Sequence, residues 1–106
     1  MRITVVGGGI VGASAAFHLA RLGAEVCLVD SSASGRATFA GAGIVCPWLS
    51  ESTDPRYEAI SFAGARYYPE LVSMLAAAGE TGIDYSLVGG LVIGASAVEL
   101  DPVMRR

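Results

Sequence analysis

The sequence has few of the residues that usually carry metal or disulfide chemistry. Its 106 positions include two cysteines and one histidine. Cys27 and Cys46 form no CxxC pair, and no metal-like set of ligands accompanies them. His18 falls inside a predicted helix, where a surface or packed histidine is the ordinary case. We therefore expect no metal site and two reduced thiols, as is usual for a cytosolic protein.

Basic clusters and long hydrophobic runs are also missing. The formal net charge is -3, and no basic cluster is larger than Arg105 and Arg106. This balance argues against a nucleic-acid partner, although a local anion site is compatible with it. No uninterrupted apolar run reaches the roughly 18 residues that a membrane span needs. Glycines interrupt any signal-peptide core near the N-terminus, so we expect a cytoplasmic protein.

Hydrophobic residues, by contrast, are abundant. They make up 53% of the chain, and charged residues only 16%. A chain of 106 residues has much surface for its volume and cannot easily hide so many apolar groups. Either part of this surface meets more protein, or the sequence belongs to something larger.

The first thirty residues predict a strand, a helix and a second strand. Residues 2–6 are rich in β-branched side chains, which favours a buried strand. Apolar residues recur at helical spacing over residues 10–22, and Gly23 is suited to end that helix. Residues 25–30 read as a second buried strand. Such a βαβ unit has parallel strands and a right-handed crossover.

The rest of the chain is less regular. Residues 31–43 are rich in Ser, Gly and Ala, which predicts a loop with at most a short helical turn. Asp54 followed by proline is typical of a helix start, and the apolar pattern predicts a helix to about residue 78. Pro69 should kink or divide this helix. Residues 87–93 suggest another strand, and the last ten residues could begin a helix.

Gly7, Gly9 and Gly12 fit a GxGxxG motif between the first strand and the first helix. In dinucleotide-binding proteins the first glycine permits the tight turn, the second lets the backbone approach a pyrophosphate, and the third allows close helix packing. The phosphates then lie at the helix N-terminus, where free N–H groups and the helix dipole favour negative charge. The motif therefore predicts a dinucleotide site.

Asp30 strengthens this prediction because it ends the second predicted strand. An acid at that position can accept hydrogen bonds from ribose hydroxyls. Its negative charge disfavours a 2′-phosphate, so NAD or FAD fits better than NADP. The acid does not choose between these two, since both present an adenosine ribose.

The segment GRATFAGAGIVCPW, residues 35–48, resembles the second cofactor segment of the FAD-dependent D-amino acid oxidase family. Glycine oxidases and D-amino acid dehydrogenases are members of this family. The stretch from residue 2 to residue 30 and the stretch TGIDYSLVGGLVIG, residues 81–94, resemble it too. The matching positions in the loop are Arg36, Thr38, Ala40, Gly41, Ala42, Gly43 and Ile44.

This resemblance implies an α/β fold that begins with a Rossmann-like βαβ FAD-binding unit. Residues 1–80 would form the N-terminal part of the FAD-binding domain. Residues 81–106 would enter a second, substrate-binding domain that is incomplete here. Family members are several times longer, so we expect a truncated piece that self-associates through its exposed sheet edge.

The resemblance also implies a set of cofactor contacts. The phosphate end would meet the glycine turn and arginine segment, the adenosine end would meet the second strand, and the flavin would meet the alanine-glycine stretch. These residues are Gly7, Gly9, Ile10, Val11, Gly12, Asp30, Ser31, Arg36, Ala37, Thr38, Ala42, Gly43 and Ile44. Family members often carry Glu where this chain has Asp30. Some attach flavin through a histidine where this chain has Ala40, so we expect FAD to bind non-covalently.

The implied activity is oxidation of the amine of a small amino acid, such as glycine, sarcosine or a D-amino acid, to an imine by hydride transfer to FAD. Two alternatives stay open: a non-catalytic dinucleotide-binding subunit and a fragment of an NAD-dependent dehydrogenase. The substrate-binding residues of the family lie beyond Arg106. Tyr57 and Tyr85 read better as packed or surface residues, so no catalytic residue is assigned.

Overall fold

The computed structural model describes residues 1–50, 52 and 54–105. The chain forms two compact units, Met1–Ile44 and Val45–Arg106. The predicted boundary at residue 80 concerns the domains of a complete enzyme, and it stays a prediction.

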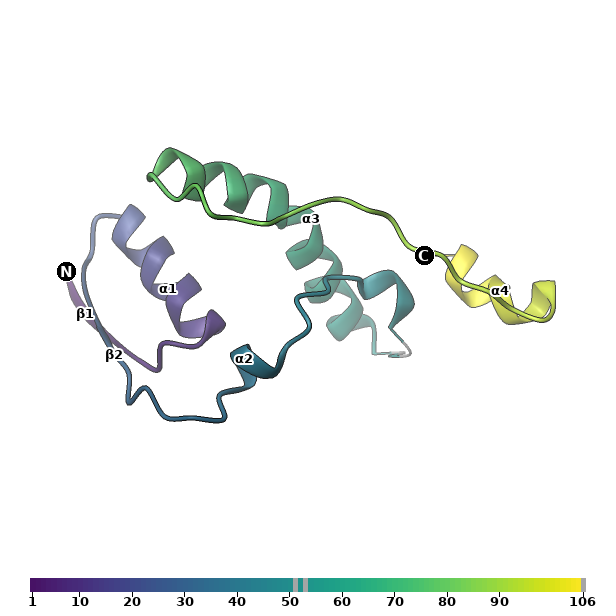
Figure 1. Cartoon of the computed structure of the whole chain (residues 1–106), viewed down its shortest axis with the longest axis horizontal. Helices are drawn as coiled ribbons and strands as arrows, with labels where there is room; N and C mark the ends of the chain where they lie inside the picture. Colours follow the sequence, from purple (N-terminus) through teal and green to yellow (C-terminus); the bar gives the residue numbers. More distant parts are fainter. Residues whose placement is uncertain (51, 53, 106) are drawn as a thin grey trace. The chain divides into compact units, whose positions relative to one another are not determined.

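The first unit contains the predicted βαβ arrangement (Figure 1). Strand β1 (Arg2–Val6) is followed by helix α1 (Ile10–Arg21) and strand β2 (Glu25–Val29). The two strands are parallel, and α1 packs against both of them. The predicted fold class is therefore confirmed, with β2 ending one residue before Asp30.

Helix α1 ends where the sequence predicts. The N–H groups of Leu22 and Gly23 donate to carbonyls in the last turn, and Gly23 has a φ of 84°. This left-handed conformation is open to glycine at little cost, which explains why the helix stops there. The chain can then turn directly into β2.

The loop after β2 contains one short helix, α2 (Ala37–Ala40). Gly41 closes it by donating its N–H to the carbonyl of Ala37 over 3.1 Å. The predicted short helical turn within residues 31–43 is therefore confirmed. It places Arg36 and Thr38 at the start of an ordered turn.

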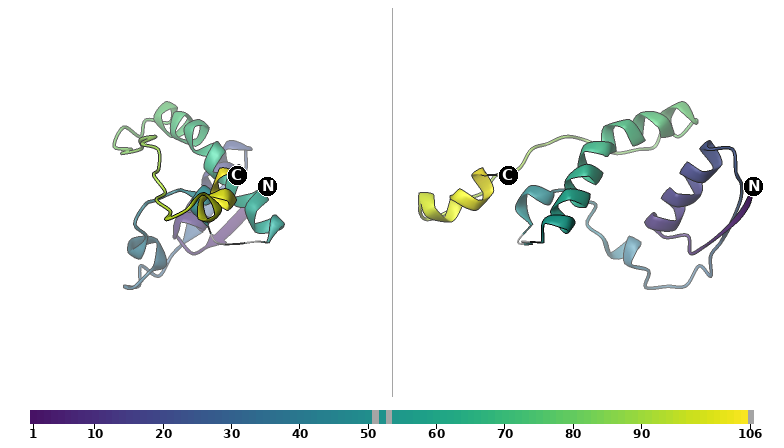
Figure 2. Two further views of the ribbon diagram at one scale, coloured as in Figure 1. Left: turned by 90° about the vertical axis from the view of Figure 1, so that its right-hand side faces the viewer. Right: turned by 180° about the vertical axis from the view of Figure 1, so that it is seen from behind.

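The second unit is helical, with a short 3-10 turn η1 (Pro47–Leu49), α3 (Pro55–Ala77) and α4 (Ala97–Met104). Asp54 caps α3 as predicted, because its side chain accepts the N–H of Arg56 over 2.9 Å. Pro69 does not divide α3, which stays one helix. The ribbon bends along its length in Figures 1 and 2, as expected of a helix that contains an internal proline.

Aromatic pairs hold parts of this second unit together. The rings of Trp48 and Phe62 meet edge to face at 5.4 Å, which joins η1 to α3. The rings of Tyr68 and Tyr85 stack at 5.8 Å, so the segment after α3 returns alongside that helix (Figure 1). This packing agrees with the sequence interpretation of Tyr85 as a packed or surface residue.

The strand predicted at residues 87–93 is wrong. The structure has no regular secondary structure there, and Gly89 adopts a φ of 74°. A strand needs a neighbouring strand to pair its N–H and C=O groups. The described residues supply none, and the side chains of Leu87 and Ile93 are 83% and 87% exposed.

None of the described residues is buried. Apolar side chains of both units face outward, including Val6 at 83% and Val11 at 81% exposure. A chain with this composition normally hides such groups in a core. In this structure its apolar faces are instead open to solvent.

Candidate functional site

The turn between β1 and α1 leaves backbone N–H groups open at the start of the helix. Gly7 has a φ of 102° and donates its N–H to the carbonyl of Val29 over 2.8 Å. The helical hydrogen bonds begin with Ala13, which donates to Gly9. The N–H groups of Ile10, Val11 and Gly12 precede this ladder. That of Ile10 already donates to Thr38 Oγ1 over 3.0 Å, so those of Val11 and Gly12 are the donors for a bound anion.

Gly12 permits the close approach of α1 to this turn. A Cβ atom at Gly12 would overlap the carbonyl oxygen of Gly7 and lie 3.0 Å from the Gly7 carbonyl carbon. It would also lie 3.5 Å from a methyl group of Val5. Because two of these atoms are backbone, the turn and helix can keep this geometry only with glycine at the position.

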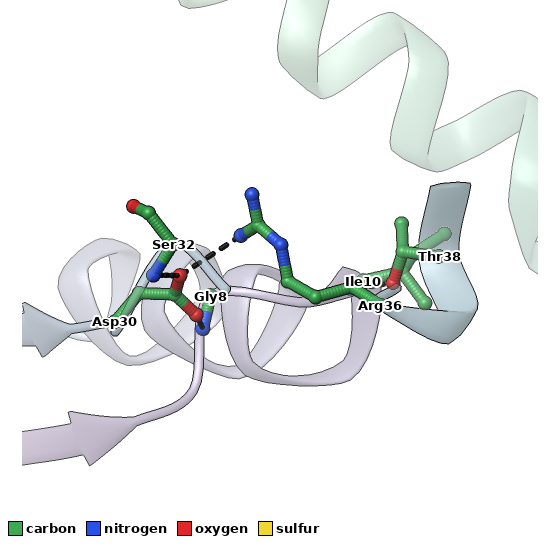
Figure 3. Close-up of polar contacts among 6 residues, drawn as sticks. All are labelled: Gly8, Ile10, Asp30, Ser32, Arg36 and Thr38. Atoms are coloured by element: carbon green, nitrogen blue, oxygen red, sulfur yellow. Dashed lines mark hydrogen bonds and ion pairs between the residues drawn. The ribbon is translucent and has the colours of Figure 1, made fainter. Parts of the chain in front are cut away.

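Asp30 lies just past β2 and is held by three donors (Figure 3). Its Oδ2 accepts the N–H of Gly8. Its Oδ1 accepts the N–H of Ser32 over 2.7 Å and Nη1 of Arg36 over 2.8 Å. The Asp30 side chain is 21% exposed, so the carboxylate is fixed in position yet still reachable.

These contacts also fix the charge of Asp30. The backbone hydrogen bonds from Gly8 and Ser32 lower the pKa of the Asp30 carboxyl below its usual value. Desolvation opposes this shift less strongly than the two backbone bonds favour it, and the positive charge of Arg36 makes the smallest contribution, which also lowers the pKa. A lowered pKa keeps the group a carboxylate at neutral pH, where it can only accept hydrogen bonds.

Arg36 is held on two sides and has a donor to spare. Its guanidinium carbon lies 4.6 Å from the ring centre of Phe39, while Nη1 is paired with Asp30. Its Nε is buried and has no hydrogen-bond partner among the described residues. A buried guanidinium donor without an acceptor is costly, and the oxygen of a phosphate would satisfy it.

Thr38 connects the loop to the start of α1. Its Oγ1 accepts the N–H of Ile10 over 3.0 Å (Figure 3). A Cβ atom at Gly9 would lie 3.1 Å from this same oxygen. The glycine turn and the loop after β2 are therefore in direct contact, as a shared site requires.

The other predicted site residues are placed less tightly. Ser31 follows Asp30 directly, and Ala37 is the first residue of α2. Ala42, Gly43 and Ile44 form an open segment after α2, in which Gly43 has a φ of 71° and Ile44 is 80% exposed. In the described part of the chain, no hydrogen bond ties these three to the start of α1.

Two residues of the site, Gly8 and Phe39, are not among those predicted from the sequence. Gly8 donates to Asp30, and a Cβ atom on Gly8 would lie 3.1 Å from that side chain. The run of three glycines offered a signal for it, but the motif counts only the first and third. Phe39 follows Arg36 by three residues, a spacing that brings side chains together on a helical turn.

The arrangement suits a nucleotide diphosphate. Open N–H groups and the spare Nε of Arg36 offer donors to an anion, and the Asp30 carboxylate offers an acceptor for ribose. FAD carries both kinds of group, so the residues present fit it.

The described residues contain no cluster of three metal-ligating side chains, and both cysteines are free. Within the same residues, no helix has the length and apolar character to cross a bilayer.

Comparisons with known proteins also indicate a relation to FAD-dependent proteins. The family model described as DAO, FAD dependent oxidoreductase, matches residues 2–106. An uncharacterized oxidoreductase, YurR, of Bacillus subtilis is 44% identical over 96% of this chain and 27% of its own length. A glycine oxidase of Pseudomonas aeruginosa is 39% identical over 78% of this chain and 22% of its own length.

A solved structure agrees with these relatives. The iminodiacetate oxidase IdaA of Chelativorans sp. BNC1 superposes with a TM-score of 0.86 at 47% identity, over 99% of this chain and 28% of that protein. The chain thus spans about a quarter of the length of these proteins. The resemblance predicted from the glycine turn and the arginine segment is confirmed, and the chain belongs to the DAO family of FAD-dependent oxidoreductases.

Proposed function

We propose that this chain forms the dinucleotide-binding part of an enzyme that oxidises the amine of a small amino acid, with FAD bound non-covalently. The observation that carries the proposal is the contact between Gly8 and Asp30. It joins the open helix start, suited to a diphosphate, to the carboxylate suited to the adenosine ribose. The glycine oxidase and iminodiacetate oxidase among the relatives support amine oxidation.

Different residues would hold different parts of the cofactor. The N–H groups of Val11 and Gly12 and Nε of Arg36 would donate to the diphosphate, while Asp30 would accept from the ribose. Thr38 keeps the loop against the helix start through Ile10. Ser31 and Ala37 flank these contacts, and the small residues Ala42 and Gly43, with Ile44, leave room for the flavin ring.

When bound, FAD would supply the acceptor for a hydride from the α-carbon of the amino acid. The amine nitrogen would also release a proton, and water would convert the resulting imine to the oxo acid and the free amine, which is ammonia for a primary amine. The part played by these residues is to fix the cofactor so that the reacting carbon can be aligned with it. Residues that bind the substrate are expected outside the 106 positions.

The proposal is tested on the complete gene product that contains this sequence. Purified protein should show the two long-wavelength absorption bands of oxidised flavin. Anaerobic addition of glycine, sarcosine or D-alanine should bleach them. Bands that no amine or amino acid bleaches would point to a cofactor-holding subunit, and stabilisation by NAD without flavin bands would indicate a dehydrogenase. Either outcome would contradict the proposal.

Non-covalent attachment is a separate prediction. The position at which some relatives carry a flavin-linking histidine holds Ala40, whose methyl side chain cannot form that bond. After acid precipitation, the yellow colour should therefore stay in the supernatant. Colour that remains in the washed pellet would show a covalent link elsewhere and overturn the prediction.

A further inference from the structure

The contacts of Asp30 limit how it can recognise a nucleotide. We propose that the Asp30 carboxylate has one acceptor position left and therefore binds one ribose hydroxyl, not both, with Arg36 setting this limit. The inference rests on the proposed dinucleotide function. It concerns how many hydroxyls of the adenosine ribose the Asp30 carboxylate binds.

The limit follows from the two oxygens of the carboxylate. A carboxylate offers about four lone-pair positions, two on each oxygen. Oδ1 is filled by the N–H of Ser32 at 2.7 Å and by Nη1 of Arg36 at 2.8 Å. Among the residues that the structure describes, Oδ2 accepts the N–H of Gly8 alone. One position on Oδ2 is left, enough for a single hydroxyl donor.

Two of the three donors are fixed by the backbone. Gly8 belongs to the turn before α1, and Ser32 lies two residues past Asp30 with a φ of 52°. Neither can leave without disturbing the turn that carries it. Arg36 is the one side chain among the three donors. The residue at this position therefore decides whether both lone-pair positions of Oδ1 are occupied.

Arg36 is also restrained. Its guanidinium lies over the ring of Phe39 at 4.6 Å, and its side chain is only 30% exposed. A planar guanidinium that stacks on an aromatic ring keeps a defined orientation. With Nη1 on Oδ1, the buried Nε has no acceptor among the described residues. One side chain can therefore occupy Oδ1 of Asp30 and keep a donor that a diphosphate oxygen would satisfy.

The test compares three ligands on the wild-type gene product stripped of flavin. FAD and its analogues lacking the adenosine 2′-hydroxyl or the 3′-hydroxyl are titrated by flavin fluorescence or calorimetry. We expect one analogue to bind about tenfold or more weakly than FAD, and the other to bind within about twofold of it. Equal losses for both analogues, or no loss for either, would overturn the inference while leaving FAD binding intact. Failure of FAD itself to bind would reject the proposed function as well.

The variant Arg36→Met tests whether Arg36 is the residue that limits Asp30 to one ribose hydroxyl. Arg36→Met removes Nη1 and keeps the apolar stem, which opens a position on Oδ1. The analogue that binds the wild-type protein almost as tightly as FAD should then bind the variant severalfold more weakly than FAD does. The matched control is Arg56→Met, because Arg56 also pairs with an aspartate, Asp54, but at 90% side-chain exposure in the second unit. A uniform loss of affinity for all three ligands in Arg36→Met, with unchanged ratios, would mean that Arg36 does not set the limit.

Discussion

Replacing Gly12 with alanine is expected to destabilise the first unit by roughly 1–3 kcal/mol, the usual cost of overpacking. The added methyl group would overlap the carbonyl oxygen of Gly7 and touch Val5. Since the Gly7 carbonyl is backbone, either α1 moves away from β1 or the turn opens. Both changes displace the N–H groups of Val11 and Gly12, so retained flavin should fall sharply.

Gly64→Ala is the matched control, because it makes the same change inside a helix. A Cβ atom at Gly64 meets nothing within 4 Å, and the residue lies within α3. Alanine there should add about 0.5–1 kcal/mol of stability. Both variants are made in the complete gene product and compared by urea unfolding and flavin content. Equal stability and equal flavin content in the two variants would contradict the packing argument.

The 106-residue chain expressed alone is expected to self-associate. None of its described residues is buried, and Val6, Leu91 and Ile93 are each more than 80% exposed. The sheet has two strands, so each strand has one unpaired edge. Its relatives are about four times longer. We infer that their additional residues cover comparable surfaces, which here are open to a second copy.

Light scattering across a range of concentrations tests this prediction. The mass should rise above that of one chain, 10.8 kDa, as concentration increases. Leu91→Lys places a charge on the exposed segment without touching the βαβ unit, and it should shift association to higher concentration if that segment takes part. A wild-type chain that stays monomeric at high concentration would show that these surfaces do not associate.

Local patterns predicted the elements that depend on neighbouring residues. Helix α1 follows from apolar spacing and from Gly23, and the start of α3 follows from the Asp54 cap. These features are formed by groups close in sequence, so no distant partner is needed. The segment at residues 87–93 was predicted wrongly for the opposite reason: its β-branched residues favour a strand, but a strand exists only beside another.

The candidate site was predicted only in part, because some of its contacts join residues that are distant in sequence. The glycine turn and the acid after β2 were visible as a motif at familiar spacing. The contacts of Gly8 and Phe39 were not, because they depend on how the loop after β2 folds back. That fold brings Arg36 to Asp30 and Thr38 to the start of α1.

The βαβ unit, the glycine turn, the acid at Asp30 and the family of the chain can all be inferred from residue patterns. That Asp30 is already held by three donors, and that Arg36 lies between Asp30 and Phe39, becomes visible in the folded chain. The difference lies in how far apart along the chain the interacting residues are. A turn or a helix is encoded by residues a few positions apart, whereas the number of free lone pairs on a carboxylate depends on every group that the folded chain brings to it.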